Sequence, residues 1–304
     1  MKPDSVLDHQ PLVVSQAQRQ FFFDHGYLAL PGHVGDRWVS RLREAMAELI
    51  DRSRACSQSD EIFSLEEGHS AATPRLHRIS SPQDHHPVFW EFMSDPVMTD
   101  LAADFVGPDV KFHHAKLNVK AGKGSRGFKW HQDIQAWPHT DFSPVSFGVY
   151  IDGCRDDQGP LAFVRDSHKG RLFSMYDEQG NFVVRIRDEE TGWIRKEQIE
   201  APTGPAGTVV LVNCRIVHGS LINRSDDNRP LLLAVYSSAD SFAFTPSPIR
   251  SRYQGAIVRG GPARYASFAP YDFELPPDWS GGYRTPWIYQ KEEDARRQAV
   301  AANM

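Results

Sequence analysis

Short β-type runs separated by turn residues dominate the chain from Lys111 to Ser238. These runs are HHAKLNVKA, PVSFGVYID, LAFV, FVVRIR, GTVVLVN and RPLLLAVYSS, and Gly, Pro, Asp and Asn lie between them. Runs of this length that are rich in Val, Leu, Phe and Tyr are typical of strands. Many short strands with turn signals between them favour a sandwich or a barrel. The pattern therefore predicts a mainly β fold.

Helical patterns precede this β region. The segment from Ser15 to Tyr27 begins with a Ser cap and has Gly26 where a helix would end, which predicts a short helix. A second helix is expected from about Gly35 to Arg52, because apolar residues recur there at steps of three and four. These recurring residues are Val39, Leu42, Ala45, Met46 and Leu49.

Three further segments complete the chain. A third helix is expected from Pro87 to Phe105, and the polar stretch between Cys56 and Pro87 is expected to be a loop. The tail from Ser241 onward alternates at neither the strand period nor the helix period, so its role stays open.

Charge and cysteine content narrow the class of protein. The chain has 34 Lys and Arg against 39 Asp and Glu, a formal net charge of -5, so we expect no nucleic acid and no anionic membrane as partner. Its three cysteines form no CxxC pair, which argues against a disulfide framework and fits a reducing cytoplasm. Because the charge balance favours neither of these partners, a small-molecule partner is expected. Neither a signal peptide nor an apolar run of membrane-spanning length is evident, so we expect neither secretion nor membrane insertion.

One motif carries the chemistry of a metal site. In FKWHQDIQAW, His131 and Asp133 are two residues apart, so in an extended chain their side chains point to the same face. His218 follows the strand-like run GTVVLVN and is the third candidate ligand. Two histidines and one carboxylate on one side of a metal leave positions open, which is the arrangement that iron(II) oxygenases use.

A basic residue and a hydroxyl group follow the distal histidine. Arg229 stands eleven residues after His218 at the start of a strand-like run, where a guanidinium can bind the far end of a dicarboxylate through two hydrogen bonds. Ser220 can add a hydroxyl contact. Taken singly, His131 and Asp133 also fit a surface pair, and His218 fits a core histidine.

This spacing of HxD, distal histidine and arginine resembles the phytanoyl-CoA dioxygenase-like (PhyH) family of Fe(II)/2-oxoglutarate-dependent dioxygenases. The stretch QGPLAFVRDSHKG and the opening FFFDHGYLALPG are also similar to that family. The resemblance covers about residues 15 to 238. It implies a double-stranded β-helix, also called a jelly roll or cupin-like fold, that holds Fe(II), 2-oxoglutarate and O2. It implies that His131, Asp133 and His218 ligate the iron, and that an intact carboxylate at position 133 favours hydroxylation over halogenation.

Ectoine hydroxylases, a branch of this family, are similar over FKWHQDIQAW. The resemblance implies that Asn118 contacts 2-oxoglutarate together with Ser220 and Arg229, and that Trp137 faces the substrate. Val212 and Leu233 stand where ectoine hydroxylases have pocket aromatics, which argues against ectoine itself. His114 and Lys116 share a strand face with Asn118 and are candidates for the substrate pocket.

The remaining histidines and Cys214 receive structural interpretations. His85, His86, His113, His114 and His139 are expected to lie in loops or at the surface, with the pocket as the open alternative for His114. Cys214 is expected to be a buried thiol.

The sequence thus predicts one dioxygenase domain over residues 1–304. Its parts are a helical N-terminal part at about 15–105, a β-helix core at about 108–240 and a C-terminal extension at 241–304. The expected reaction is hydroxylation of an aliphatic C–H bond of a small molecule. A zinc-dependent hydrolase and a non-catalytic jelly-roll binding protein remain alternatives, because two histidines and a carboxylate also bind zinc. Oligomeric state and substrate stay open.

Overall fold

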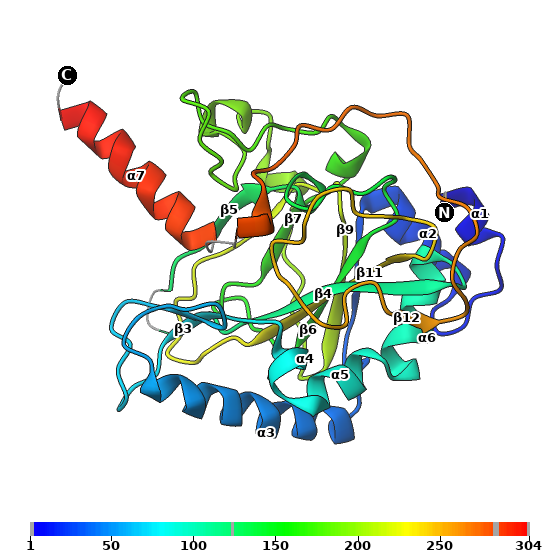
Figure 1. Ribbon diagram of the computed structural model, residues 1–304, viewed down its shortest axis with the longest axis horizontal. Helices are drawn as coiled ribbons and strands as arrows, with labels where there is room; N and C mark the ends of the chain where they lie inside the picture. The colour runs from blue at the N-terminus through cyan, green and yellow to red at the C-terminus, as the bar shows by residue number, and fades with distance from the viewer. Residues whose placement is uncertain (1–2, 123–124, 282–285, 303–304) are drawn as a thin grey trace.

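Two antiparallel sheets form the centre of the protein (Figure 1). The computed structural model describes residues 3–122, 125–281 and 286–302. The large sheet has eight strands, of which seven follow one another across the sheet and the eighth pairs at the side. In spatial order the seven are β1 (Tyr27–Leu30), β9 (Thr208–Asn213), β6 (Val145–Tyr150), β11 (Leu231–Ser238), β4 (Val110–Asn118), β3 (Leu76–Ser80) and β2 (Phe63–Leu65). The eighth, β12 (Ile257–Arg259), pairs with β4. The small sheet has four: β5 (Phe128–His131), β10 (His218–Ser220), β7 (Leu161–Val164) and β8 (Ile199–Glu200). This is the jelly roll that the sequence predicts.

Successive side chains along the strands of the large sheet point alternately to its two faces, and the two sets form two apolar layers. Phe147, Leu211 and Leu232 lie on the outer face and belong to the main core, which the helices cover. The neighbouring residues Val210 and Leu231 lie on the inner face, in a second cluster that includes residues of the small sheet. Because side chains of a strand alternate between its faces, both faces of this sheet are buried.

Five helices lie on the outer face of the large sheet, among them the two expected from Ser15 to Tyr27 and from about Gly35 to Arg52. They are α2 (Gln16–His25), α3 (Asp36–Arg52), α4 (Pro82–His85), α5 (Pro87–Met93) and α6 (Pro96–Val106), and a short α1 (Pro3–Leu7) precedes them. Ser15 and Gln18 form a capping box at the start of α2, and Gly26 ends it with a φ of 83°. Figure 1 shows α3 along one side of the large sheet, with α4 and α5 beside it.

Three expectations about local structure were wrong. The helix predicted from Pro87 to Phe105 is broken into α5 and α6, because Pro96 has no N–H and Asp95 caps a new helix by accepting a hydrogen bond from the Val97 N–H at 2.9 Å. The segment between Cys56 and Pro87 is not merely a loop, since it contains β2, β3 and α4. The run FVVRIR forms no named strand, because Val184 has a φ of 54°, outside the strand region.

The tail adds a strand and a long helix that its sequence pattern does not predict. Strand β12 pairs with β4, and helix α7 (Pro286–Ala302) extends away from the body of the protein near β5 (Figure 1). Among the described residues, none of the helices is both long and apolar enough to cross a membrane. The division into one domain with an N-terminal part, a core and an extension stays a prediction.

Candidate metal centre and pocket

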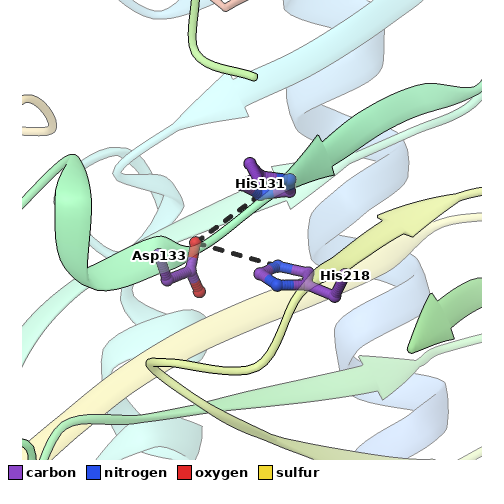
Figure 2. Close-up of side chains that lie close together, drawn as sticks. All are labelled: His131, Asp133 and His218. Atoms are coloured by element: carbon purple, nitrogen blue, oxygen red, sulfur yellow. Dashed lines mark ion pairs between the residues drawn. The ribbon is translucent and has the colours of Figure 1, made fainter. Parts of the chain in front are cut away.

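His131, Asp133 and His218 converge between β5 and β10. His131 ends β5 and His218 begins β10, and the two residues are directly paired across the strands. Asp133 lies two residues after His131, at the start of a single 3-10 turn. The Oδ1 atom of Asp133 is 3.8 Å from the Nε2 atom of each histidine (Figure 2). All three side chains are buried, and one ligand atom from each lies within 4.8 Å of the others.

Hydrogen bonds orient both imidazoles in the same way. Nδ1 of His131 lies 3.0 Å from the carbonyl oxygen of Lys129, and Nδ1 of His218 lies 3.0 Å from that of Ile216. A carbonyl oxygen only accepts hydrogen bonds, so each Nδ1 carries the proton and each Nε2 keeps its lone pair. The lone pairs are therefore available on the side where Asp133 lies.

Charge and burial favour a neutral imidazole next to a charged carboxylate. The burial of His131 and, as a smaller cause, the neighbouring His218 lower the pKa of His131 to about 3. Burial alone would raise the pKa of Asp133, but His218, Lys116 and His131 together with the Ser146 hydroxyl lower it to about 2. Ser146 Oγ donates to Asp133 Oδ2 at 2.8 Å. This donor set of two neutral nitrogens and one carboxylate oxygen suits a divalent first-row metal.

Arg229 lies buried in the same cavity with unused donors. Its Nη2 donates to the carbonyl oxygen of Gly159 at 3.0 Å, whereas Nε and Nη1 have no hydrogen-bond partner among the described residues. Its guanidinium lies 5.6 Å from the ring of Tyr150. A buried guanidinium with unused donors is costly unless a ligand accepts from them, and a carboxylate is a strong acceptor for such a group.

Ser220 and Asn118 also offer polar groups to this cavity. Ser220 Oγ accepts hydrogen bonds from Lys120 Nζ at 2.9 Å and from the Phe128 N–H at 3.3 Å, so its hydroxyl proton is available to a ligand. The Oδ1 atom of Asn118 is buried and has no hydrogen-bond partner within the described part of the chain. Both residues therefore fit a ligand that is held at the Arg229 end.

All the residues singled out from the sequence line one cavity. They are His131, Asp133, His218, Arg229, Ser220, Asn118, Trp137, His114 and Lys116. Cys214 is buried, as expected. The interpretation of His113 and His139 as loop or surface residues was wrong, since both are buried. The ring centroids of His113 and His139 are 4.7 Å apart, and the Nδ1 atoms of His113 and His114 are 2.6 Å apart.

Several residues of the cavity were not found from the sequence. Lys120 follows Asn118 by two residues, so the same alternation could have found it. Arg78 lies on β3, inside the stretch expected to be a loop, and Trp287 lies on α7 in the tail without a readable pattern. No local signal marks either of them.

The model of the phytanoyl-CoA dioxygenase (PhyH) family matches residues 22–231. The chain belongs to this family. It is a non-haem iron enzyme whose cofactors are Fe(II), 2-oxoglutarate and O2, and the donor set and the free guanidinium described above fit that iron and that cosubstrate. Membership favours the dioxygenase over the zinc hydrolase and the binding protein.

Named relatives of this PhyH member include two kinds of dioxygenase. A probable alpha-ketoglutarate-dependent hypophosphite dioxygenase of Stutzerimonas stutzeri is 26% identical over 80% of this chain and 85% of its own. An ectoine dioxygenase of Streptomyces avermitilis is 27% identical over 79% of this chain and 85% of its own.

Solved structures share the fold. EctD from S. alaskensis with bound Fe has a TM-score of 0.66 at 23% identity and covers 86% of this chain and 90% of its own. EctD from S. alaskensis with 2-oxoglutarate and 5-hydroxyectoine has a TM-score of 0.64 at 24% identity and covers 86% of this chain and 93% of its own.

Proposed function

We propose that this dioxygenase hydroxylates an aliphatic C–H bond of a small molecule, with iron held by His131, Asp133 and His218. The observation that carries the proposal is the convergence of two imidazole nitrogens and a carboxylate oxygen, with both histidines oriented by backbone carbonyls. Three protein ligands on one side leave positions for a cosubstrate and for dioxygen. The bound iron supplies the activation of O2 that the side chains cannot provide.

Arg229, Ser220 and Asn118 bind 2-oxoglutarate in this proposal. The free Nε and Nη1 donors of Arg229 suit the distal carboxylate, and the Ser220 hydroxyl can donate to the same group. Lys120 orients Ser220 without competing for the ligand, because burial and then the nearby Arg229 lower its pKa to about 6. These residues fix the cosubstrate at one end, so its keto acid end is directed toward the metal.

Trp137, His114 and Lys116 form the substrate wall in this proposal. His114 and Lys116 lie on β4 with Asn118, so the three side chains share one face. The ring centroids of Trp137 and His114 are 5.7 Å apart. Val212 and Leu233 line the same cavity, where aliphatic side chains give less aromatic contact than the sequence pattern of ectoine hydroxylases implies. We therefore infer a substrate other than ectoine.

A succinate-release screen tests the proposal. The Fe(II)-loaded protein is incubated with 2-oxoglutarate, O2 and a metabolite library, and both succinate and the oxygenated product are measured by mass spectrometry. H131A and H218A should abolish succinate release, whereas H9A, at an exposed histidine, should retain it. Equal turnover in H131A and the wild type would refute the assignment of the metal ligands.

A further inference from the structure

The start of α7 forms part of the cavity wall. Pro286 and Trp287, the first two residues of this helix, line the cavity together with the metal ligands. Both residues lie beyond residues 22–231, which the family model matches. Part of the wall around the metal centre therefore comes from outside the matched region.

The indole of Trp287 bridges the two sheets. It stacks on the His77 ring of β3, with ring centroids 5.0 Å apart and an angle of 11° between the planes. It meets the Phe128 ring of β5 edge to face, with 5.3 Å between the centroids. The guanidinium of Arg78, next to His77 on β3, lies 5.6 Å from the same indole. Because β3 belongs to the large sheet and β5 to the small sheet, one side chain spans the space between them.

This contact lies where the two sheets end. β5 is the outermost strand of the small sheet, and β3 is the last but one strand at the β2 end of the large sheet. In the described part of the chain no strand pairs β3 with β5. Figure 1 shows α7 near β5. A sheet edge stays open unless a helix or a loop covers it, and here the start of α7 does so.

Only one aromatic ring separates Trp287 from a metal ligand. The ring centroid of Phe128 is 4.7 Å from that of His131, so Phe128 contacts both His131 and Trp287. The Trp287 side chain is half-buried, as expected at a boundary between a cavity and solvent. Aromatic side chains cover a large apolar area, so removing the indole would widen the opening beside Phe128.

Contacts farther along α7 hold the helix in this position. Glu293 pairs with the buried guanidinium of Arg185, and Gln290 Nε2 donates to the carbonyl oxygen of Val184 at 3.2 Å. Both partners lie in a segment that is distant in sequence from α7. The helix is therefore fixed to the body of the protein within two turns of Trp287.

We propose that Trp287 closes the outer end of the cavity above the metal centre and limits the size of the molecules that reach it. This inference rests on the function proposed above. The indole excludes substrates with several fused rings and favours compact ones, because a wider molecule would have to displace its contacts with His77 and Phe128. It also keeps bulk water away from the loaded site, which strengthens the electrostatic contacts inside.

Anaerobic removal of Fe(II) by chelators of different size tests this inference. The Fe(II)-loaded protein is mixed with picolinate, a single-ring chelator, or with phenanthroline, a chelator of fused rings, and the absorbance of the released iron complex is followed over time. Phenanthroline should remove the metal from W287A about tenfold or more faster than from the wild type, whereas the rate with picolinate should change much less. The ratio of each rate to that of the wild type cancels differences in charge and affinity between the chelators.

Further variants separate closure from general damage. W287F should retain most of the discrimination, because a phenyl ring covers part of the same opening. W193A, at a tryptophan stacked on Phe173 outside the cavity lining, should behave like the wild type. Where circular dichroism shows that W287A does not fold, W287L replaces it, with the same expected result.

Two outcomes overturn the inference. One is an unchanged rate with phenanthroline, which would show that Trp287 does not obstruct access to the metal. The other is an equal acceleration with both chelators, which would show that the variant loosens the metal ligands instead of opening the cavity. Failure of the wild type to bind Fe(II) would refute the proposed function itself.

Discussion

The guanidinium of Arg229 is held by the carbonyl oxygen of Gly159, which accepts from Nη2 at 3.0 Å. Gly159 has a φ of 69°, and a Cβ atom there would lie 2.5 Å from the carbonyl oxygen of Leu221. Only glycine adopts this conformation without strain and leaves room for the neighbouring chain. The contact fixes one edge of the Arg229 guanidinium at the wall of the cavity.

Replacing Arg229 should remove cosubstrate binding without removing the metal. In R229M the distal carboxylate of 2-oxoglutarate loses a buried charged partner, which costs about 3 kcal/mol, or about a hundredfold in dissociation constant. Calorimetry of 2-oxoglutarate binding to the Fe(II)-loaded protein measures this change. R224M, at an exposed arginine, serves as the control. An unchanged dissociation constant in R229M would show that the cosubstrate binds elsewhere.

Ser146 should control how well Asp133 holds the metal. Its hydroxyl donates to Asp133 Oδ2, so S146A frees the carboxylate to rotate away from the two histidines. The loss of such an outer hydrogen bond typically weakens metal affinity by about 10- to 100-fold. Competitive Fe(II) titration against a chelator measures the effect. S94A, which removes a hydroxyl bonded to a helix carbonyl, should leave the affinity unchanged.

Buried neutral histidines should make the protein sensitive to acid. Burial lowers the pKa of His139 from 6.5 to about 4 and lowers that of His113 well below 6.5. Between pH 6.5 and about 4, His139 binds a proton in the unfolded chain but stays neutral in the folded protein. The free energy of unfolding therefore falls as the pH drops through this range. His139 alone accounts for roughly 3 kcal/mol of this loss.

Urea unfolding of the metal-free protein at a series of pH values tests this prediction. H139N should show a shallower dependence on pH than the wild type, because one proton-binding difference is removed. A slope in H139N as steep as that of the wild type would contradict the assignment to His139.

The ion pair of Arg185 with Glu293 should hold α7 in place. Both side chains are almost fully buried, so E293A removes the nearest carboxylate from the buried Arg185 charge, which keeps only the more distant Asp188 and Asp294. We expect the loss to cost roughly 3 kcal/mol. E189A, which removes an exposed partner of Arg297, should cost under about 1 kcal/mol. Hydrogen exchange of α7 and of residues 182–187 measures the local opening. Protection equal to that of the wild type in E293A would show that other contacts anchor the helix.

Residues close together in the sequence made the metal site predictable. The two-residue spacing of His131 and Asp133 expresses strand geometry directly, and the fold then brings His218 to them through strand pairing. The family resemblance supplied what spacing alone left open. Arg78 and Trp287 were missed because long-range contacts place them: β3 joins the sheet by pairing with β4, and α7 reaches the cavity from the far end of the chain. FVVRIR has the apolar pattern of a strand, but tertiary packing against α7 overrides it.

The direct pairing of His131 with His218 makes the ligand spacing a property of two short strands. The segment that joins them can vary in length without moving either imidazole, provided that β5 and β10 keep their alignment. A slip of one residue between those strands would instead turn a histidine outward and abolish the centre. Insertions for engineering new specificity therefore belong in the connecting loops, and deletions within either strand are to be avoided.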